Sequence, residues 1–186
     1  MIDQDQPNTR PGRPRLGGWL RIALIGRNPN VTLARAAILV ATCVVVFKFV
    51  LLPIRVEGVS MLPAYKDKSL NFVNRLAYLR HEPRRGDVVG LRLGGTNALY
   101  RTPSVMYMKR IVGLPGETVA FADGHLLING TALDEPYVNG PCDWNCAPVT
   151  VNPNQYFVVG DNRSMPRDYH VFGQAKKEQI VGKVLF

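Results

Sequence analysis

A serine and a lysine lie in segments that could make them reactive. Ser60 lies in the segment GVSMLP at residues 58–63, between a glycine and a proline. Lys109 lies in the apolar, strand-like segment YMKRIV at residues 107–112. A serine hydroxyl is a weak nucleophile until a base removes its proton, and a lysine can be that base only where burial lowers its pKa. The two segments therefore predict that Ser60 is a nucleophile and Lys109 its general base, although on the residues alone an inert serine and a solvated lysine remain alternatives.

An apolar run from Ala36 to Ile54 comes just before Ser60. A helix needs about 20 mainly apolar residues to cross a bilayer, and Lys48 can extend its ammonium to the headgroups near one end of the run. β-Branched residues lie all round such a helix, which favours lipid on every side. The run predicts a transmembrane helix over residues 31–54 that brings Ser60 close to the membrane surface. A cleaved secretory signal, disfavoured by the length of the run, and a buried helix of a soluble protein are the alternatives.

The net charge of +9 is compatible with a nucleic-acid or an anionic membrane partner. Six arginines precede the apolar run, against two aspartates: Arg10, Arg13, Arg15, Arg21, Arg27 and Arg35, against Asp3 and Asp5. This distribution is typical of a cytoplasmic N-terminus, and no nucleic-acid motif accompanies the charge. Residues 1–30 are therefore predicted to be a flexible, basic cytoplasmic tail, in which Trp19–Ile25 could lie along the membrane surface. No nucleic-acid partner is expected.

Residues 55–186 are expected to form a mostly antiparallel β domain outside the cytoplasm. Short apolar runs alternate with turn signals, and the pairs Asp123-Gly124 and Asn129-Gly130 mark hairpins because these residues tolerate positive φ. The expected strands begin near Asn71, Val88, Tyr107, Thr118, His125, Tyr156 and Ile180. A turn of helix is expected before Arg80. The fold class is therefore mostly β, with one transmembrane helix at the N-terminal side.

Two of the three cysteines, Cys142 and Cys146, are close in sequence. Metal binding would need further ligands, and the three histidines are scattered, so no metal site is expected. Outside the cytoplasm a small-loop disulfide between the two cysteines is allowed, and two free thiols are the alternative. Cys43 lies in the apolar run, where it serves as a small apolar residue.

Five segments, in order, resemble those of type I signal peptidases, which are membrane-anchored serine proteases that remove signal peptides from exported proteins. The segments lie within residues 54–186: GVSMLP at 58–63, RGDVV at 85–89, KRIVGLPGE at 109–117, ING at 128–130 with EPY at 135–137, and GDNR at 160–163 with Asp168 and Phe172-Gly173. Five matches in order behind an apolar span are highly specific.

The resemblance implies the roles of several residues. Ser60 would attack the scissile carbonyl, neutral Lys109 would accept its proton, and an acyl-enzyme would form without metal or cofactor. The Ser60 backbone N–H would help bind the oxyanion, while Met61 and Pro63 would shape the approach to the serine. The substrates would be preproteins with small residues, usually alanine, at the first and third positions before the cut. Independently of the resemblance, the proximity of Leu51, Leu52, Met61 and Leu62 to the predicted site and span makes them the expected lipid contacts.

Three positions depart from the family pattern. Gly58 provides no hydroxyl to the oxyanion hole, as in some members of the family. Pro166 stands where a serine usually hydrogen-bonds the catalytic lysine, and Ser164 is the nearby candidate to replace it. Asp168 matches the family's aspartate, but His170 replaces its arginine partner, so we expect a weaker or pH-dependent ion pair. The turn at residues 160–163 is interpreted as a structural brace.

The predicted function is removal of N-terminal signal peptides by a Ser60–Lys109 dyad, in a single-pass protein of the cell membrane. One alternative is a specialised peptidase for one pilin or secreted component, suggested by the altered last motif. Another is a membrane-anchored homologue that binds signal peptides without cutting them, which only Pro166 supports. A soluble, self-cleaving repressor would need a DNA-binding head where this chain has an apolar span.

Overall fold

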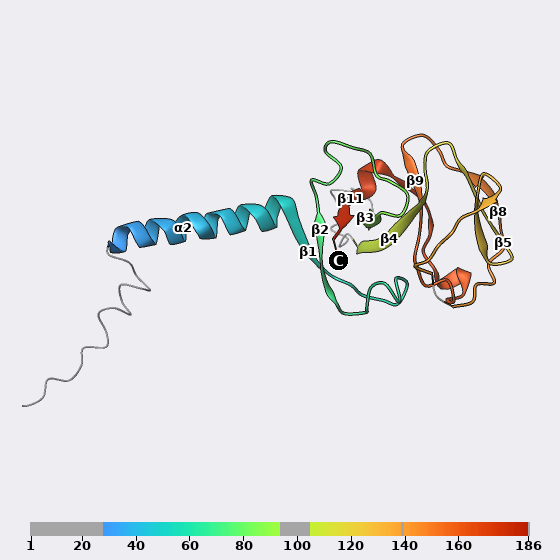
Figure 1. The fold of residues 1–186 in the computed structure, drawn as a ribbon, viewed down its shortest axis with the longest axis horizontal. Helices are drawn as coiled ribbons and strands as arrows, with labels where there is room; N and C mark the ends of the chain where they lie inside the picture. The colour runs from blue at the N-terminus through green and yellow to red at the C-terminus, as the bar shows by residue number, and fades with distance from the viewer. Residues whose placement is uncertain (1–27, 94–104, 139, 186) are drawn as a thin grey trace, which may run out of the picture. The chain divides into compact units, whose positions relative to one another are not determined.

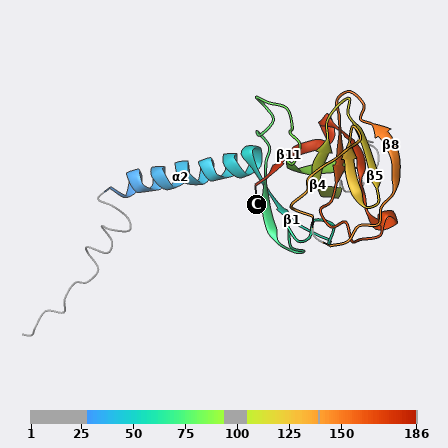
Figure 2. The same ribbon diagram turned by 45° about the vertical axis from the view of Figure 1, so that its right-hand side comes forward.

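The computed structural model describes residues 28–93, 105–138 and 140–185, and the chain divides into two compact units, residues 1–44 and 45–186. The predicted basic tail, with Trp19–Ile25, lies almost wholly outside the described residues. Figures 1 and 2 show one long helix followed in sequence by a body of strands. The predicted fold class, mostly antiparallel β with one N-terminal apolar helix, is confirmed.

The helix α2 covers Pro29–Val45 and continues as a π-helical turn, η1, over Val46–Val50. The stretch Asn30–Val50 is long and apolar enough to cross a membrane. The most apolar 18 residues of this stretch are not buried against any other described part of the chain. The helix ends four residues before the predicted end at Ile54, because Leu51–Arg55 form strand β1. Pro53 explains the difference, since proline has no N–H for a helical hydrogen bond and holds the preceding residue extended.

A seven-stranded sheet forms the larger part of the β unit, in the order β1-β2-β11-β3-β4-β9-β10, and all its neighbouring strands are antiparallel. Its remaining strands are β2 (Leu70–Asn74), β3 (Val88–Leu93), β4 (Val105–Gly113), β9 (Gln155–Val159), β10 (Gly173–Lys176) and β11 (Ile180–Val184). The segment after β2 forms turns rather than the expected turn of helix. Two short 3₁₀ turns, η2 (Arg167–Tyr169) and η3 (Lys177–Gln179), flank β10.

A second sheet has four strands in the order β7-β6-β5-β8, again antiparallel. Its strands are β5 (Thr118–Ala122), β6 (His125–Ile128), β7 (Thr131–Ala132) and β8 (Cys146–Thr150). The two predicted hairpin turns are confirmed, because Asp123 and Asn129 have φ of 47° and 51° and a left-handed glycine follows each. A core that includes Phe121, Trp144 and Phe157 joins this sheet to β9 of the larger one.

Close approach of strands in the larger sheet depends on Gly182. A β-carbon at Gly182 would lie 2.2 Å from the backbone oxygen of Asn74, whereas one at its cross-strand partner Gly90 would meet only side chains, the nearest at 3.3 Å. We expect Gly182→Ala to lower the free energy of unfolding by about 1–3 kcal/mol, since backbone must move. Urea unfolding measures this, with Gly90→Ala as the matched control. Equal losses in the two variants would contradict the explanation.

Candidate active site

Ser60 lies in the turn that follows β1, and the last motif of the chain holds this turn in place. The Asn162 backbone N–H donates to the Ser60 carbonyl oxygen at 3.0 Å, and the Asn162 side-chain amide donates to the Val59 carbonyl oxygen at 3.0 Å. At the other side, the Gly58 N–H donates to Asp67 Oδ1 at 2.8 Å. The Ser60 backbone is therefore held from both sides while its side chain stays half-buried.

Lys109 lies in β4, in the middle of the larger sheet, where it pairs with Val89 of β3. Lys109 is only 2% exposed, and its Nζ donates a hydrogen bond to Ser60 Oγ at 2.8 Å. Burial lowers the pKa of Lys109 to about 8, against an opposing effect of the Asp161 carboxylate. The structure thus brings together the two residues predicted from the sequence, and the lowered pKa makes the neutral form of the lysine far more accessible near neutral pH than for an ordinary lysine.

Arg110 and Asp161 form a buried ion pair beside the lysine. Arg110 Nε and Nη2 donate to the two carboxylate oxygens of Asp161 at 2.8 and 2.6 Å, and its Nη1 donates to the Gly86 carbonyl oxygen at 2.8 Å. The guanidinium also lies 3.9 Å from the centre of the Tyr137 ring. Successive side chains of a strand point to opposite faces, so Arg110 faces away from Lys109. Arg110, and not Lys109, therefore neutralises Asp161.

A second buried pair fixes the other end of the same turn. Arg163 is 1% exposed and donates through its two terminal nitrogens to Glu135, at 2.9 and 2.6 Å, and through Nε to the Gly160 carbonyl oxygen. With the Asn162 contacts to the serine turn, every polar side chain of residues 161–163 makes a structural contact. This arrangement fits the interpretation of the turn as a brace.

The predicted supporting residues have different surroundings from those expected. Met61 is 2% exposed, so the expected lipid contact of its side chain is wrong: it packs in the core with Val73 and Val88. Ser164 is exposed and its Oγ donates to Asn162 Oδ1 at 2.6 Å, so it does not take the place of a serine on Lys109.

Asp168 and His170 do not form the expected ion pair. Asp168 is exposed in the 3₁₀ turn η2 and has no ion pair within the described part of the chain. His170, by contrast, is buried against aromatic rings. The physical reason is that a carboxylate remains in water unless it is paired, whereas a neutral imidazole can enter an apolar core.

A cleft of about 490 Å³ lies beside Ser60. It is lined by residues of β1, the serine turn and the first half of β4: Leu52, Pro53, Ile54, Arg55, Val56, Glu57, Gly58, Ser60, Met61, Met106, Tyr107 and Met108. β1 is an edge strand, and β4 pairs with β9 only from Arg110 onward. Among the described strands, β1 and residues 105–109 of β4 thus each have an unpaired edge, and side chains of both line the cleft.

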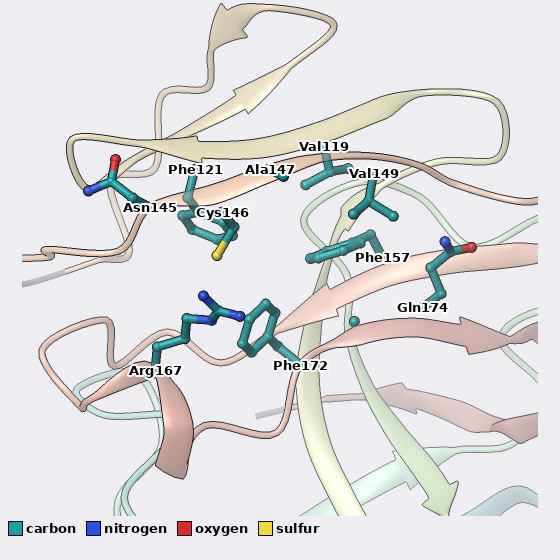
Figure 3. A pocket seen from close by; sticks show the side chains of 11 residues that line it. Val119, Phe121, Asn145, Cys146, Ala147, Val149, Phe157, Arg167, Phe172 and Gln174 are labelled. Atoms are coloured by element: carbon teal, nitrogen blue, oxygen red, sulfur yellow. The ribbon is translucent and has the colours of Figure 1, made fainter.

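A larger hollow, of about 610 Å³, lies between β8 and β10 (Figure 3). Phe121, Phe157 and Phe172 line it, with Arg167 at one side. Neither Ser60 nor Lys109 borders this hollow, so its size does not make it the site of the predicted chemistry. Cys146 also lines it, and both Cys142 and Cys146 are free thiols.

No group of three histidine, cysteine, aspartate or glutamate side chains suited to a metal ion occurs within residues 28–93, 105–138 and 140–185. Sequence reasoning did not find the Arg110–Asp161 pair or the burial of His170. Adjacent charged residues at Lys109-Arg110 were a usable signal for the first, because alternation in a strand must place them on opposite faces. The sequence carries no comparable signal for His170.

The buried ion pair leads to a stability prediction. Asp161→Asn leaves the Arg110 guanidinium, whose side chain is 12% exposed, without its counter-charge. We expect the free energy of unfolding to fall by about 3–5 kcal/mol, as when one partner of a buried pair is removed. The control is Lys177→Gln, which breaks the exposed Lys177–Glu82 pair but leaves the Tyr156 hydrogen bond to Glu82 in place, and should cost about 0–1 kcal/mol. Urea unfolding of the two variants would contradict the argument if their losses were alike.

Comparison with known proteins places the chain in a family. Residues 30–186 match the family described as "Signal peptidase, peptidase S26". The chain is 36% identical over 129 residues to a signal peptidase I of Leptolyngbya laminosa; the match covers 68% of this chain and 63% of that protein, so the chain spans less than two thirds of that relative. It is 36% identical over 163 residues to a signal peptidase I of Bacillus caldolyticus, covering 79% and 85% of the two chains.

A crystal structure of a signal peptidase I from Enterococcus faecalis is also similar, at 29% identity over 55% of this chain and 96% of that one. Its TM-score of 0.41 is too low to support an argument about the fold. The sequence matches carry the assignment by themselves, because the family match includes both the serine and the lysine segments. The chain belongs to the signal peptidase family, peptidase S26.

Proposed function

We propose that this protein is a membrane-bound serine endopeptidase that removes N-terminal signal peptides from exported proteins. The observation that carries the proposal is the 2.8 Å hydrogen bond between Lys109 Nζ and Ser60 Oγ, made by a buried lysine whose pKa is lowered to about 8. This separation allows the neutral amine to accept the hydroxyl proton as the serine attacks.

The reaction then follows from the two side chains. Ser60 Oγ bonds to the scissile carbonyl carbon while its proton passes to Lys109 Nζ. The ammonium returns that proton to the leaving amine as the peptide bond breaks, which leaves an acyl-enzyme and a neutral lysine. A water, deprotonated by Lys109, then releases the signal peptide. The Ser60 backbone N–H is the proposed oxyanion donor, a contribution whose loss typically costs about 10²–10³ in rate.

The substrate is proposed to enter the cleft beside Ser60 as an extended strand. The unpaired edges of β1 and of residues 105–109 in β4 can supply backbone hydrogen bonds to such a peptide. Main-chain bonding of this kind tolerates varied sequences, so selectivity must come from side-chain pockets along the strand. The family resemblance indicates that these pockets accept small residues at the first and third positions before the cut.

The membrane is the proposed second partner. Asn30–Val50 would span the bilayer of the cell membrane once, with the arginine-rich N-terminus in the cytoplasm and the β unit outside. Preproteins present their cleavage sites near the same surface, so tethering raises the effective concentration of enzyme for substrate. Leu51, Leu52 and Leu62, which are partly exposed, remain the proposed lipid contacts.

Cleavage of a preprotein with an Ala-x-Ala site tests the proposal directly. We expect the full-length protein in liposomes to cut after the second alanine, and Ser60→Ala and Lys109→Met to lose activity while their unfolding curves stay close to that of the wild type. Ser164→Ala, which alters a nearby exposed hydroxyl, is the control and should keep its rate. If the wild type leaves a generic preprotein intact, the proposal is replaced by one of two alternatives. One is a peptidase with a dedicated substrate, and the other is a homologue that only binds signal peptides, which Pro166 would favour.

The pH dependence tests the role of the lysine. Since the neutral amine is the base, kcat/KM should rise with pH through an apparent pKa of about 8 and fall as the pH drops below that value. Values of kcat/KM measured between pH 5 and 10 at constant ionic strength would show this decrease on the acidic side, the acid limb of the pH profile. The neutral-lysine mechanism fails if no group titrates below the ordinary lysine value of about 10.4.

A further inference from the structure

His170 is a buried histidine that the proposed mechanism does not use. It is 5% exposed, and neither Nδ1 nor Nε2 makes a hydrogen bond of ordinary geometry among the described residues, although backbone groups of Asn162 and Val171 lie near the ring. Burying polar atoms without partners costs stability, so such a group calls for an explanation. Its surroundings would suit a phenylalanine: the Trp144 ring lies 4.9 Å away, edge to face, and the Phe172 ring 6.4 Å away.

The imidazole lies beside the reactive pair. A β-carbon at Gly160 would lie 2.2 Å from the Ser60 carbonyl oxygen and 2.5 and 2.8 Å from Cε1 and Nε2 of His170. Gly160 therefore allows the ring and the serine backbone to approach the same point from two sides. Val171 and Phe172, the residues that follow His170, border a small cavity of about 50 Å³ together with Lys109.

Burial and the neighbouring positive charges keep His170 neutral. Burial first, and then the positive charges of Lys109 on β4 and Arg163 in the turn after β9, lower its pKa to about 4. A neutral imidazole carries one N–H donor and one acceptor nitrogen. At the pH where Lys109 acts as a base, His170 thus offers an acceptor and adds no positive charge to the site.

Lys109 needs an acceptor of this kind. Its neutral amine has a lone pair and two N–H bonds, and the lone pair must point at the Ser60 hydroxyl for proton transfer. The hydrogen bond to Ser60 Oγ is the only one that Nζ makes to the described residues. Pro166, which is exposed, offers no hydroxyl, and Ser164 bonds to Asn162. The buried amine and the buried imidazole are thus complementary groups, and both lie near the backbone of the Ser60 turn or its side chain.

We propose that His170 is a positioning residue for Lys109: its acceptor nitrogen is linked to Nζ through one hydrogen-bonded water, and so aims the lysine lone pair at Ser60. The inference rests on the proposed function and deepens it, because it assigns to an imidazole the orienting role for which the chain has no serine hydroxyl. His170 itself does not touch the substrate.

Two substitutions separate positioning from packing. His170→Phe fills the aromatic site but removes the acceptor, whereas His170→Gln keeps an acceptor oxygen. We expect His170→Phe to keep or raise the Tm, to lower kcat about tenfold, and to leave KM within about twofold. Since an acceptor favours the ammonium, its loss should also move the acid limb of the pH profile to lower pH. His170→Gln should recover part of kcat.

Wild-type kcat and an unmoved acid limb in His170→Phe would overturn the inference. Equal losses in the Phe and Gln variants with a lowered Tm would also overturn it, because they would indicate packing alone.

A second measurement does not depend on catalysis. In Ser60→Ala protein labelled with ¹⁵N-histidine, the acceptor nitrogen of His170 should shift when Lys109→Met is added, since the lysine end of the proposed water bridge is lost. An unchanged His170 signal would count against the contact. If the wild type proves inactive on preproteins while this shift is observed, the proposed function fails and the His170–Lys109 contact stands.

Discussion

The burial of Lys109 is the constraint on which the rest of the site depends. A lysine can act as a base near neutral pH only where water is largely excluded, and here the centre of a seven-stranded sheet excludes it. The same burial requires that nearby charges be compensated elsewhere. Arg110 pairs with Asp161, and Arg163 pairs with Glu135, so both carboxylates have partners other than Lys109, and the remaining effect of Asp161 on the lysine is smaller than that of burial.

The turn at residues 160–163 connects these requirements to Ser60, the proposed nucleophile. Asp161 holds it to β4, Arg163 holds it to the segment after β7, and Asn162 holds the backbone of the serine turn. Two of these contacts, Arg110–Asp161 and Arg163–Glu135, are bidentate and leave little freedom of orientation, and the Asn162 hydrogen bonds extend them to the serine turn. The precision of the Ser60–Lys109 distance is thus a property of the whole brace, which consists of residues that take no part in the chemistry.

The proposed function explains why the strand edges beside Ser60 are unpaired. An open edge is normally a liability, because it can pair with any extended chain. In this protein β1 and the first half of β4 present such edges to one cleft that Ser60 also lines. Pro53 in β1 and the short length of both edges limit unwanted pairing, while an extended substrate can still use the backbone groups that remain.

Much of this protein could be predicted from local sequence. The apolar run and the two left-handed hairpin turns each depend on neighbouring residues, and local chemistry is sufficient to identify them. Ser60 and Lys109 were singled out by the family resemblance, because the residues alone left an inert serine and a solvated lysine as alternatives. The helix end was misplaced by four residues because the apolar run continues into β1 without a change of composition. Tertiary structure alone decided the partners of Arg110 and Arg163, the burial of Met61, and the separation of exposed Asp168 from buried His170. Each of these outcomes depends on which side chains the packed sheets bury. Contacts between segments distant in sequence decide this, and neither residue type nor spacing does.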